Sequence, residues 1–496
     1  MHHVLVIHRW TDRYADYAAY LDHTTHRVSY VTTERAARHL PVEHAAGVRL
    51  VDSTEDVKAV REAIDALVEK SGPVTRIVAL QETDLDLAAD LRDALDLPGQ
   101  RGADLEPLRD KLLMAERLAA ADVPVPPTAD APDHAAVTDF AARHGWPVLV
   151  KPRRGTASAG ITRLDSPAAL ADYAFPRDGA MLVQPWLPDE VLHVDGVFTG
   201  DGLGPWRAAR YLTTCLEFTT GTALASVEID DPDLLDRIAE ITTATTRALF
   251  SGPAVFHLEL FRGDHGALTV LEIGSRPGGA EVPFVWREVH GIDLMAVACA
   301  HQVGTEPPPL PTAPRPRSRA GCSSRRPPPA LPGPHPPALQ QDGPYAQVAP
   351  AAGALLTGGG YEHAGARFRY RGASSAEVAA AVRRTMRDAV LTAPLDPAAP
   401  PRLVVIGCGN PPYREYALHT LAGHLSTALV QPAEIDWQRR YVADRFVAAD
   451  TTDPPPPPVP PPRCSPTTPA PVPSSPGTRR CWKPPPKSPA DCTCRT

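Results

Sequence analysis

Apolar segments of strand length alternate with amphipathic segments of helical length over the first hundred residues. Because a strand covered on both faces is apolar at nearly every position, this alternation is typical of a parallel sheet with helices on both sides. It predicts an α/β domain over residues 1–103, and no Gly-x-Gly-x-x-Gly dinucleotide fingerprint follows its first strand. We expect strands at 3–8, 27–32, 47–52 and 75–80, and helices at 12–21, 54–70 and 85–95.

Helical and strand patterns are mixed differently between residues 104 and 305, where two strands carry a glutamate each. A helix at 108–121 ends before the Val-Pro-Val-Pro-Pro segment that starts at Val123, because proline cannot continue a helix. We expect one α+β unit here. Its other elements are strands at 146–151, 180–187, 191–199 and 208–214, the strands around Glu259 and Glu272, and helices at 232–250 and 282–302.

Proline dominates two later tracts, 306–344 and 452–496, which hold more than half of the 58 prolines. Such segments bury too little apolar surface to offset the entropy of ordering, so we expect both tracts to be disordered. Flexible linkers and out-of-frame translation of a GC-rich coding region are the alternatives. We favour the second hypothesis because periodic sequence resumes between the tracts, and resequencing of the coding DNA tests it.

The resumed sequence divides at about residue 397. A strand at 366–371 and a helix at 375–390 are expected within residues 345–397. Residues 398–451 start with a strand at Arg402 and predict a partial second α/β unit, with a helix at 413–424 and a strand at 426–430.

Composition excludes several classes of function. The 496 residues carry a net charge of -8 without a basic stripe, so we expect no nucleic-acid partner. No apolar run approaches the ~20 residues of a membrane-spanning helix, and the start lacks a basic leader, so a cytoplasmic protein without a membrane partner is expected. Of the 8 cysteines, most lie in the proline-rich tracts, which argues against a disulfide framework.

The two glutamates are the first candidate for chemistry. An unpaired carboxylate is costly to bury and needs a cation, a hydrogen-bond network or a raised pKa. Glu259 and Glu272 are followed by Arg276 and by the glycine pair Gly278–Gly279. Carboxylate oxygens suit Mg²⁺ (or Mn²⁺) bridging the protein to phosphate oxygens, and a planar arginine fork suits phosphoryl and carboxylate groups. Structural salt bridges are the alternative interpretation.

Cationic candidates lie upstream. Lys151 ends an apolar strand and precedes a small-residue segment containing Thr156 and Ser158, whose amides and hydroxyls can contact phosphate oxygens. Taken alone, Lys111 is an ordinary surface residue of a helix. His193 and Asp195 share one face of a strand, either as metal ligands or as a solvated face.

These residues together resemble the ATP-grasp superfamily, in its carboxylate–amine ligase branch of dipeptide and amino-acid ligases and biotin carboxylase relatives. Asp110-Lys111 with Leu118 and the Val123-to-Pro126 segment matches one motif, and Glu272-Ile273-Gly274-Ser275-Arg276-Pro277-Gly278-Gly279 matches another. The resemblance implies an α/β and α+β fold, in which a parallel N-terminal pre-ATP-grasp domain precedes a two-lobed ATP-grasp domain over 104–305.

The resemblance also implies roles for individual residues. Lys111 and Lys151, with Thr156 and Ser158, would bind the phosphates of ATP, and Glu259 and Glu272 would hold the metal. Arg276 and Lys151 would be catalytic. The strand between the lobes, with Gln184, Trp186 and Leu187, would bind adenine by backbone hydrogen bonds to its edge and apolar side chains on its faces. Glu190 would bind the ribose, with Asp189 or no residue as alternatives. The sequence departs from the family's pattern at Gln184-Pro185, where a glutamate pair is usual, and at Gly274, where asparagine is common.

The implied reaction is ATP-dependent formation of an amide bond from a small-molecule carboxylate and an amine. A non-catalytic ATP-binding protein and a damaged product of a tandem ligase gene are the rival interpretations, and a carboxylation of the biotin carboxylase kind ranks lower. Glu217 is a candidate for flanking the substrate. The substrates stay open, and so does the oligomeric state, with a homodimer as one alternative.

Overall fold

The computed structural model describes most of the first 310 residues and shorter parts of the remainder. The described residues are 2–10, 14–177, 179–219, 222–310, 319–325, 343–348, 366–388, 402–406, 426–431 and 446–448. The chain divides into one unit over residues 1–394 and another over residues 395–496. Among the described residues, every helix is too short or too polar to cross a bilayer.

The N-terminal domain is built on a four-stranded sheet whose strands are all parallel, as the sequence pattern predicted. Its order is β3-β2-β1-β4. The strands are β1 (His3–His8), β2 (Arg27–Thr32), β3 (Gly47–Leu50) and β4 (Arg76–Ala79), and helices α3 (Val57–Ser71) and α4 (Glu82–Ala94) pack with them. All six residues of β1 are buried, which explains its uninterrupted apolar pattern.

The helix expected at 12–21 is wrong in its extent, because only α1 (Tyr17–Tyr20) is helical among the described residues there. Tyr14 and Tyr17 pack their rings against Trp10 and His8, at centroid distances of 5.3 and 5.4 Å. These tertiary contacts and the absence of a side-chain cap at Asp16 account for the short helix. Short helices α2 (Glu34–Ala37) and η1 (Val42–His44) complete the domain.

The helix expected at 108–121 is two helices, α5 (Gly102–Arg109) and α6 (Lys111–Ala120). Asp110 separates them: its backbone is extended, and its carboxylate accepts hydrogen bonds from the amides of Leu112 and Leu113. An aspartate in this position satisfies amide groups that the first turn of a helix leaves without partners. This cap fixes Lys111 as the first residue of α6.

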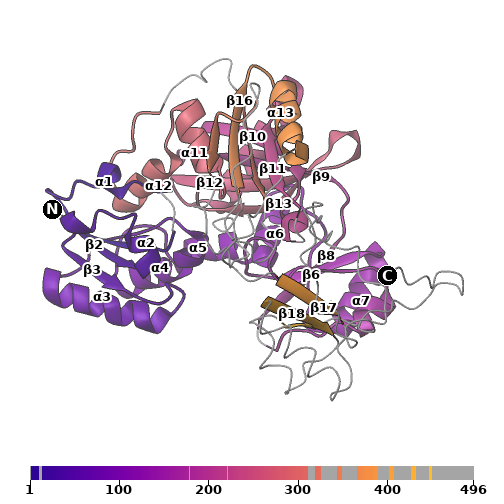
Figure 1. The fold of residues 1–496 in the computed structure, drawn as a ribbon, viewed down its shortest axis with the longest axis horizontal. Helices are drawn as coiled ribbons and strands as arrows, with labels where there is room; N and C mark the ends of the chain where they lie inside the picture. Colours follow the sequence, from indigo (N-terminus) through magenta and orange to yellow (C-terminus); the bar gives the residue numbers. More distant parts are fainter. Residues whose placement is uncertain are drawn as a thin grey trace, which may run out of the picture. The chain divides into compact units, whose positions relative to one another are not determined.

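A small antiparallel sheet of order β5-β8-β6-β7 follows, and α7 (His134–His144) and α8 (Pro167–Ala171) cover it (Figure 1). The apolar residues of this lobe form a core of their own around Phe140 and Val150. Its strands are β5 (Ala129–Asp130), β6 (Val148–Pro152), β7 (Thr162–Leu164) and β8 (Met181–Pro185).

The larger lobe contains an eight-stranded antiparallel sheet of order β13-β12-β9-β10-β11-β14-β16-β15. Successive residues of β12 point to opposite faces: Phe256 packs in the core with Ile238 of α10 (Pro232–Leu249), and Val255 packs in the core with Met295. The strands are β9 (Glu190–Phe198), β10 (Leu203–Thr213), β11 (Leu224–Glu228), β12 (Ala254–Arg262), β13 (Leu268–Gly274), β14 (Arg319–Arg325), β15 (Ala346–Val348) and β16 (Ala366–Gly372).

The helix expected at 282–302 is interrupted. It consists of α11 (Val282–Val285), a π-helical turn η3 (Trp286–His290) and α12 (Leu294–Val303). Gly291 adopts a left-handed conformation with φ 73°, and Asp293 caps α12 through the amides of Met295 and Ala296. After this break α12 packs against the N-terminal domain, and the apolar residues of α12 belong to the core that contains Val4 and Tyr17.

The expectation of disorder over 306–344 needs a correction at 319–325, because β14 pairs there with β11 on one side and β16 on the other. Backbone pairing on both edges stabilises a segment that composition alone predicts to be unstructured. Gly321 of this strand also lies against Val378 of α13 (Ser375–Asp388). The strand and helix expected at 366–371 and 375–390 are present as β16 and α13. The buried carboxylate of Glu281 ties β16 to α11 through Arg369, 2.6 Å away, and Arg367, 3.4 Å away.

The second unit contains three parallel strands, β17 (Arg402–Ile406), β18 (Ser426–Gln431) and β19 (Phe446–Ala448). Parallel pairing agrees with the α/β pattern expected from Arg402 onward. The helix expected at 413–424 and the tail at 452–496 lie outside the described residues.

Candidate active site

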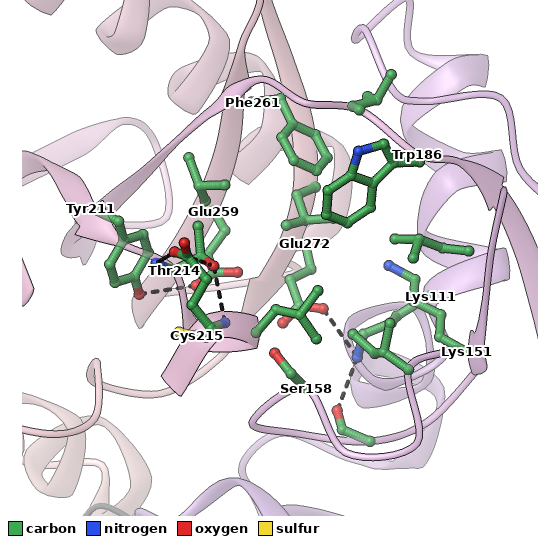
Figure 2. A pocket seen from close by; sticks show the side chains of 18 of the residues that line it. Lys111, Lys151, Ser158, Trp186, Tyr211, Thr214, Cys215, Glu259, Phe261 and Glu272 are labelled. Carbon is green, nitrogen blue, oxygen red and sulfur yellow. Dashed lines mark hydrogen bonds and ion pairs between the residues drawn. The ribbon is translucent and has the colours of Figure 1, made fainter. Parts of the chain in front are cut away.

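A cavity of about 340 Å³ lies between the small sheet and the large sheet, and most of the residues singled out from the sequence line it. Lys111, Lys151, Thr156 and Ser158 line one side, and Glu259 and Glu272 line the other. In Figure 2, Glu272 lies between Glu259 and the two lysines.

The two glutamates are direct register partners on the antiparallel strands β12 and β13. A β-bulge follows, because Leu260 pairs with Val270 and Leu271 is the extra residue. The bulge lets two consecutive residues, Leu271 and Glu272, face the same cavity, which regular alternation along a strand would prevent.

Each glutamate has one occupied oxygen and one open one. Tyr211 donates a 3.0 Å hydrogen bond to Oε1 of Glu259, and the ammonium of Lys111 lies 3.2 Å from Oε2 of Glu272. The other oxygen of each carboxylate accepts no hydrogen bond from the part of the chain that the structure describes. Burial alone would raise the pKa of Glu259, but hydrogen bonding and charge from His257, with the Tyr211 hydroxyl, keep that pKa below its ordinary value. Two carboxylates that line one cavity, each with an open oxygen, suit a hard divalent cation.

The two lysines differ in their surroundings: Lys111 has hydrogen-bond and ion-pair partners, and Lys151 is buried. Lys111 also donates a 2.9 Å hydrogen bond to the carbonyl of Gly155, and its own amide donates to the carbonyl of Arg153. The guanidinium of Arg153 binds the Asp110 carboxylate at 2.6 Å, so the cap of α6 and the loop after β6 are locked together. Lys151 is 4% exposed, and burial lowers its pKa to about 8 against the opposing charge of Glu272.

The loop between β6 and β7 has an unusual backbone. Ala157 and Ser158 adopt left-handed conformations, with φ values of 53° and 58°. Residues with a Cβ rarely adopt this conformation, and those that do cluster at functional sites. The loop places Thr156 and Ser158 at the cavity beside the two lysines, as the sequence predicted.

Apolar side chains form the far part of the same cavity. Leu149 and Ile161 come from the small lobe and Phe261 from β12, and Trp186 and Leu187 follow β8. The guanidinium of Arg163 stacks on the Trp186 ring at 4.7 Å from its centroid, which fixes the indole. Two apolar walls of this kind suit a planar aromatic base.

Two of the predicted ATP-binding residues, Gln184 and Glu190, have side chains outside the cavity. Gln184 is buried and donates a 2.9 Å hydrogen bond to the Thr128 hydroxyl, so its side chain turns away from the cavity. Glu190 forms an ion pair with Arg262 at 3.1 Å and is not among the lining residues, whereas Asp189 is. Asp189 precedes the strand and is not constrained by sheet alternation, so of the two acids considered for the ribose it is the one that lines the cavity.

A second cavity of about 310 Å³ adjoins the first, and both glutamates line the two cavities together. Arg276 lines the second cavity, and its guanidinium is fixed by Glu82, whose Oε2 accepts a 2.7 Å hydrogen bond from Nε. Nη1 donates to the carbonyl of Pro277, and Nη2 has no hydrogen-bond partner within the described part of the chain.

Glu82 is a residue of the second cavity that the sequence did not reveal. It begins α4, far from Arg276 along the chain, and no local pattern marks it. It also pairs with Arg109 at 2.5 Å. Burial would raise the pKa of Glu82, but the charges of Arg276, Arg109 and Lys111 lower it to about 2. Glu82 is therefore an ionised residue of the N-terminal domain that holds the Arg276 guanidinium in place.

His193 and Asp195 form a buried network with His257, so the solvated-face interpretation is wrong. Asp195 is 1% exposed, and its carboxylate oxygens lie 2.7 Å from Nδ1 of His193 and 2.8 Å from Nδ1 of His257. Burial alone would raise the pKa of Asp195, but the two imidazoles lower it. These three residues are close enough together to hold a metal ion. Their arrangement is equally explained without a metal, because the Asp195 carboxylate can accept a hydrogen bond from each ring and so orient both.

The approach of Gly278 to this network explains why a glycine stands there. A Cβ at residue 278 would lie 2.3 Å from Oδ1 of Asp195, closer than any real contact. Gly278 therefore lets the backbone after Arg276 lie directly over the buried carboxylate. Cys215 lines both cavities and Glu217 the first; Glu217 caps the short helix α9 (Cys215–Thr219) through the Thr214 amide.

The small antiparallel lobe, the larger sheet with paired acids and the preceding parallel domain agree with the fold that the resemblance to the ATP-grasp superfamily implied. The chain is similar to the L-amino acid ligase of Bacillus licheniformis, with a TM-score of 0.59 and 16% identity over 78% of this chain and 97% of that one. An N5-carboxyaminoimidazole ribonucleotide synthetase from Thermotoga maritima gives a TM-score of 0.56 at 16% identity, covering 78% and 98%. The carboxyaminoimidazole ribonucleotide synthase of Aspergillus clavatus complexed with ATP gives 0.58 at 12% identity, covering 78% and 98%.

Among curated proteins, a D-alanine–D-alanine ligase from Streptomyces griseus is 53% identical over 170 residues, which cover 32% of this chain and 43% of that protein. The matched part thus spans less than half of the relative's length. No family model matches the chain.

Proposed function

We propose that this protein is an ATP-dependent carboxylate–amine ligase that forms an amide bond through an acyl phosphate. The observation that carries the proposal is the position of Glu259 and Glu272, which lie at the junction of two cavities and opposite Lys111 and Lys151. One cavity has the apolar walls and cationic end that suit a nucleoside triphosphate. The adjoining cavity has room for a small acid whose carboxylate meets the terminal phosphate. The names of the similar ligases and synthetases support the same class of reaction.

The residues present fit a divalent metal. Glu259 and Glu272 would hold Mg²⁺ (or Mn²⁺) through their open oxygens, and the bound ion would neutralise charge on the phosphates of ATP. Lys111 and Lys151 would bind phosphate oxygens from the opposite side, with Thr156 and Ser158 adding hydroxyl and amide donors. Trp186, Leu187 and Phe261 would enclose the adenine.

The chemistry then needs positioning and charge stabilisation rather than a protein nucleophile. An oxygen of the substrate carboxylate attacks the γ-phosphorus of ATP and ADP leaves, giving an acyl phosphate. The amine attacks the acyl carbon, loses a proton, and expels inorganic phosphate, so that an amide remains. Arg276, held by Glu82, lines the second cavity, where it would stabilise negative charge on the carboxylate and on the acyl phosphate.

An ADP- and phosphate-release screen over a matrix of carboxylic acids and amines tests the proposal, with mass spectrometry of the products. We expect ADP release that requires both an acid and an amine and that yields a product lighter than their sum by one water. ATP binding with no ADP release from any pair would instead favour the non-catalytic interpretation.

A further inference from the structure

The second cavity has two chemically different ends. Its polar end lies at the two glutamates it shares with the ATP-binding cavity, beside Arg276, His193 and His257. Its other lining residues include Trp10 and Tyr14 of the N-terminal domain. A molecule that occupies the cavity therefore meets charge at one end and aromatic rings elsewhere.

The apolar residues form one contiguous wall. Trp10, Tyr14, Val282 and Met295 line the cavity and belong to a single hydrophobic cluster. The Trp10 and Tyr14 rings lie 5.3 Å apart, and Tyr14 lies 5.1 Å from the Phe284 ring, which backs the wall. Aromatic rings held in this way present a large apolar surface at little entropic cost.

The polar side chains that α4 and its cap contribute to this cavity, Glu82 and Gln81, already have partners. Glu82 is bound by both Arg276 and Arg109, and Oε1 of Gln81 accepts hydrogen bonds from the amide and hydroxyl of Thr83. A substrate with a charged side chain would lose water there and would compete for partners that are already bonded. An apolar side chain would lose nothing on entering.

We infer that the second cavity takes a carboxylic acid of amino-acid size with an apolar, preferably aromatic, side chain, and that Trp10 determines this specificity. The inference rests on the proposed function, because that function orients the acid with its carboxylate towards Glu259 and Glu272. The side chain then extends towards Trp10. A volume of about 310 Å³ is at the lower end of the roughly 300–1,000 Å³ typical of small-molecule sites, which limits the acid to this size.

The test measures binding and turnover separately on the full-length protein. Isothermal titration with Mg²⁺ and a non-hydrolysable ATP analogue compares phenylalanine and 3-phenylpropanoate with alanine, aspartate and lysine. We expect at least one phenyl compound to bind ~10-fold or more tightly than aspartate and lysine, since a pocket wall of this kind discriminates by about that factor. ADP release with the same acids and a mixture of amines gives the second reading.

Trp10→Ala is expected to weaken binding of the phenyl compound ~10-fold or more while changing the affinities for alanine and for the ATP analogue less than ~3-fold. Leu50→Ala is the matched control, because Leu50 is an apolar residue of the same domain that is 56% exposed and outside the cavity. Val282→Phe, which fills the cavity from the same apolar wall, should exclude the phenyl compound yet admit alanine, and it replaces Trp10→Ala if that variant fails to fold.

The outcomes separate the two claims. Binding of apolar acids that depends on Trp10, without ADP release, would support the inference and contradict the ligase function. ADP release with charged acids that is indifferent to Trp10→Ala and Val282→Phe would support the function and overturn the inference. Failure of every acid to bind beside the ATP analogue would also overturn it.

Discussion

The two cavities that meet at Glu259 and Glu272 are assembled in different ways. The first is made from short sequence segments within the two lobes: the start of α6, the end of β6 with its loop, and the ends of β8, β12 and β13. The second brings Trp10, Tyr14 and Glu82 of the N-terminal domain against Arg276, Gly278 and the buried histidines of the larger lobe. Local motifs encode the first cavity, whereas tertiary packing creates the second. Substitutions can therefore damage one while leaving the other intact.

The largest effect is expected where the cavities join. Glu272→Gln removes a charge that faces the metal position and Lys111, so we expect turnover to fall by ~10³-fold, the scale of losing a principal charge stabiliser. Substrate-dependent ADP release measures it. Glu240→Gln on the exposed side of α10 is the matched control, and unchanged turnover in Glu272→Gln would refute the metal assignment.

A smaller loss of activity is expected from a substitution that affects only the second cavity. Glu82→Gln keeps the size and shape of the side chain but removes the charge that orients Arg276. We therefore expect kcat/KM for the acid to fall ~10- to 100-fold. The KM for ATP should change less than ~3-fold, because Glu82 does not line the first cavity. Steady-state kinetics with each substrate varied in turn would distinguish this from a general loss of stability, with Glu69→Gln on the exposed face of α3 as the control. Equal losses for both substrates would contradict a role limited to Arg276.

The neighbouring glycines offer a matched pair for stability. Gly278→Ala would place a methyl group 2.3 Å from the Asp195 carboxylate, and we expect a loss of about 2–3 kcal/mol in the free energy of unfolding, as for other overpacked sites. Gly279→Ala meets no atom within 4 Å and should change it by less than about 1 kcal/mol. Urea denaturation of the two variants measures the difference, and similar stabilities would show that the backbone over Asp195 can move aside.

The smallest effect is expected for the pH dependence of stability that His8, which hydrogen-bonds to Trp10, produces. His8 is buried, its Nε2 donates to the Trp10 carbonyl, and burial lowers its pKa to about 4. The unfolded chain takes up a proton near pH 6.5 and the folded chain only near pH 4, so stability is retained above pH 6.5 and lost as the pH falls between these values. From pH 7 to pH 5 the loss attributable to His8 should be about 2 kcal/mol. Unfolding curves of His8→Gln against the parent protein check it, and an identical pH dependence in both proteins would contradict the assignment.

The sequence allowed much of the first cavity to be predicted, because its residues follow strands and caps with recognisable patterns. Lys151 ends an apolar strand, and Glu259 and Glu272 interrupt two others. Whether Asp189 or Glu190 lines the cavity could not be predicted, because a shift of one position along an extended segment reverses the direction of a side chain. Glu82 could not be predicted, since only the packing of α4 against the larger lobe brings it to Arg276. The same holds for β14, which composition assigned to a disordered tract and which pairing on both edges holds in the sheet.

The central claim is that Glu259 and Glu272 together hold a divalent ion opposite the two lysines. Electron paramagnetic resonance of Mn²⁺, titrated with a non-hydrolysable ATP analogue present, tests this directly and does not depend on knowing the substrates. We expect nucleotide-dependent binding of Mn²⁺ in the parent protein and its loss in the Glu259→Gln/Glu272→Gln double variant, with Glu240→Gln unaffected. Undiminished Mn²⁺ binding in the double variant would contradict the account.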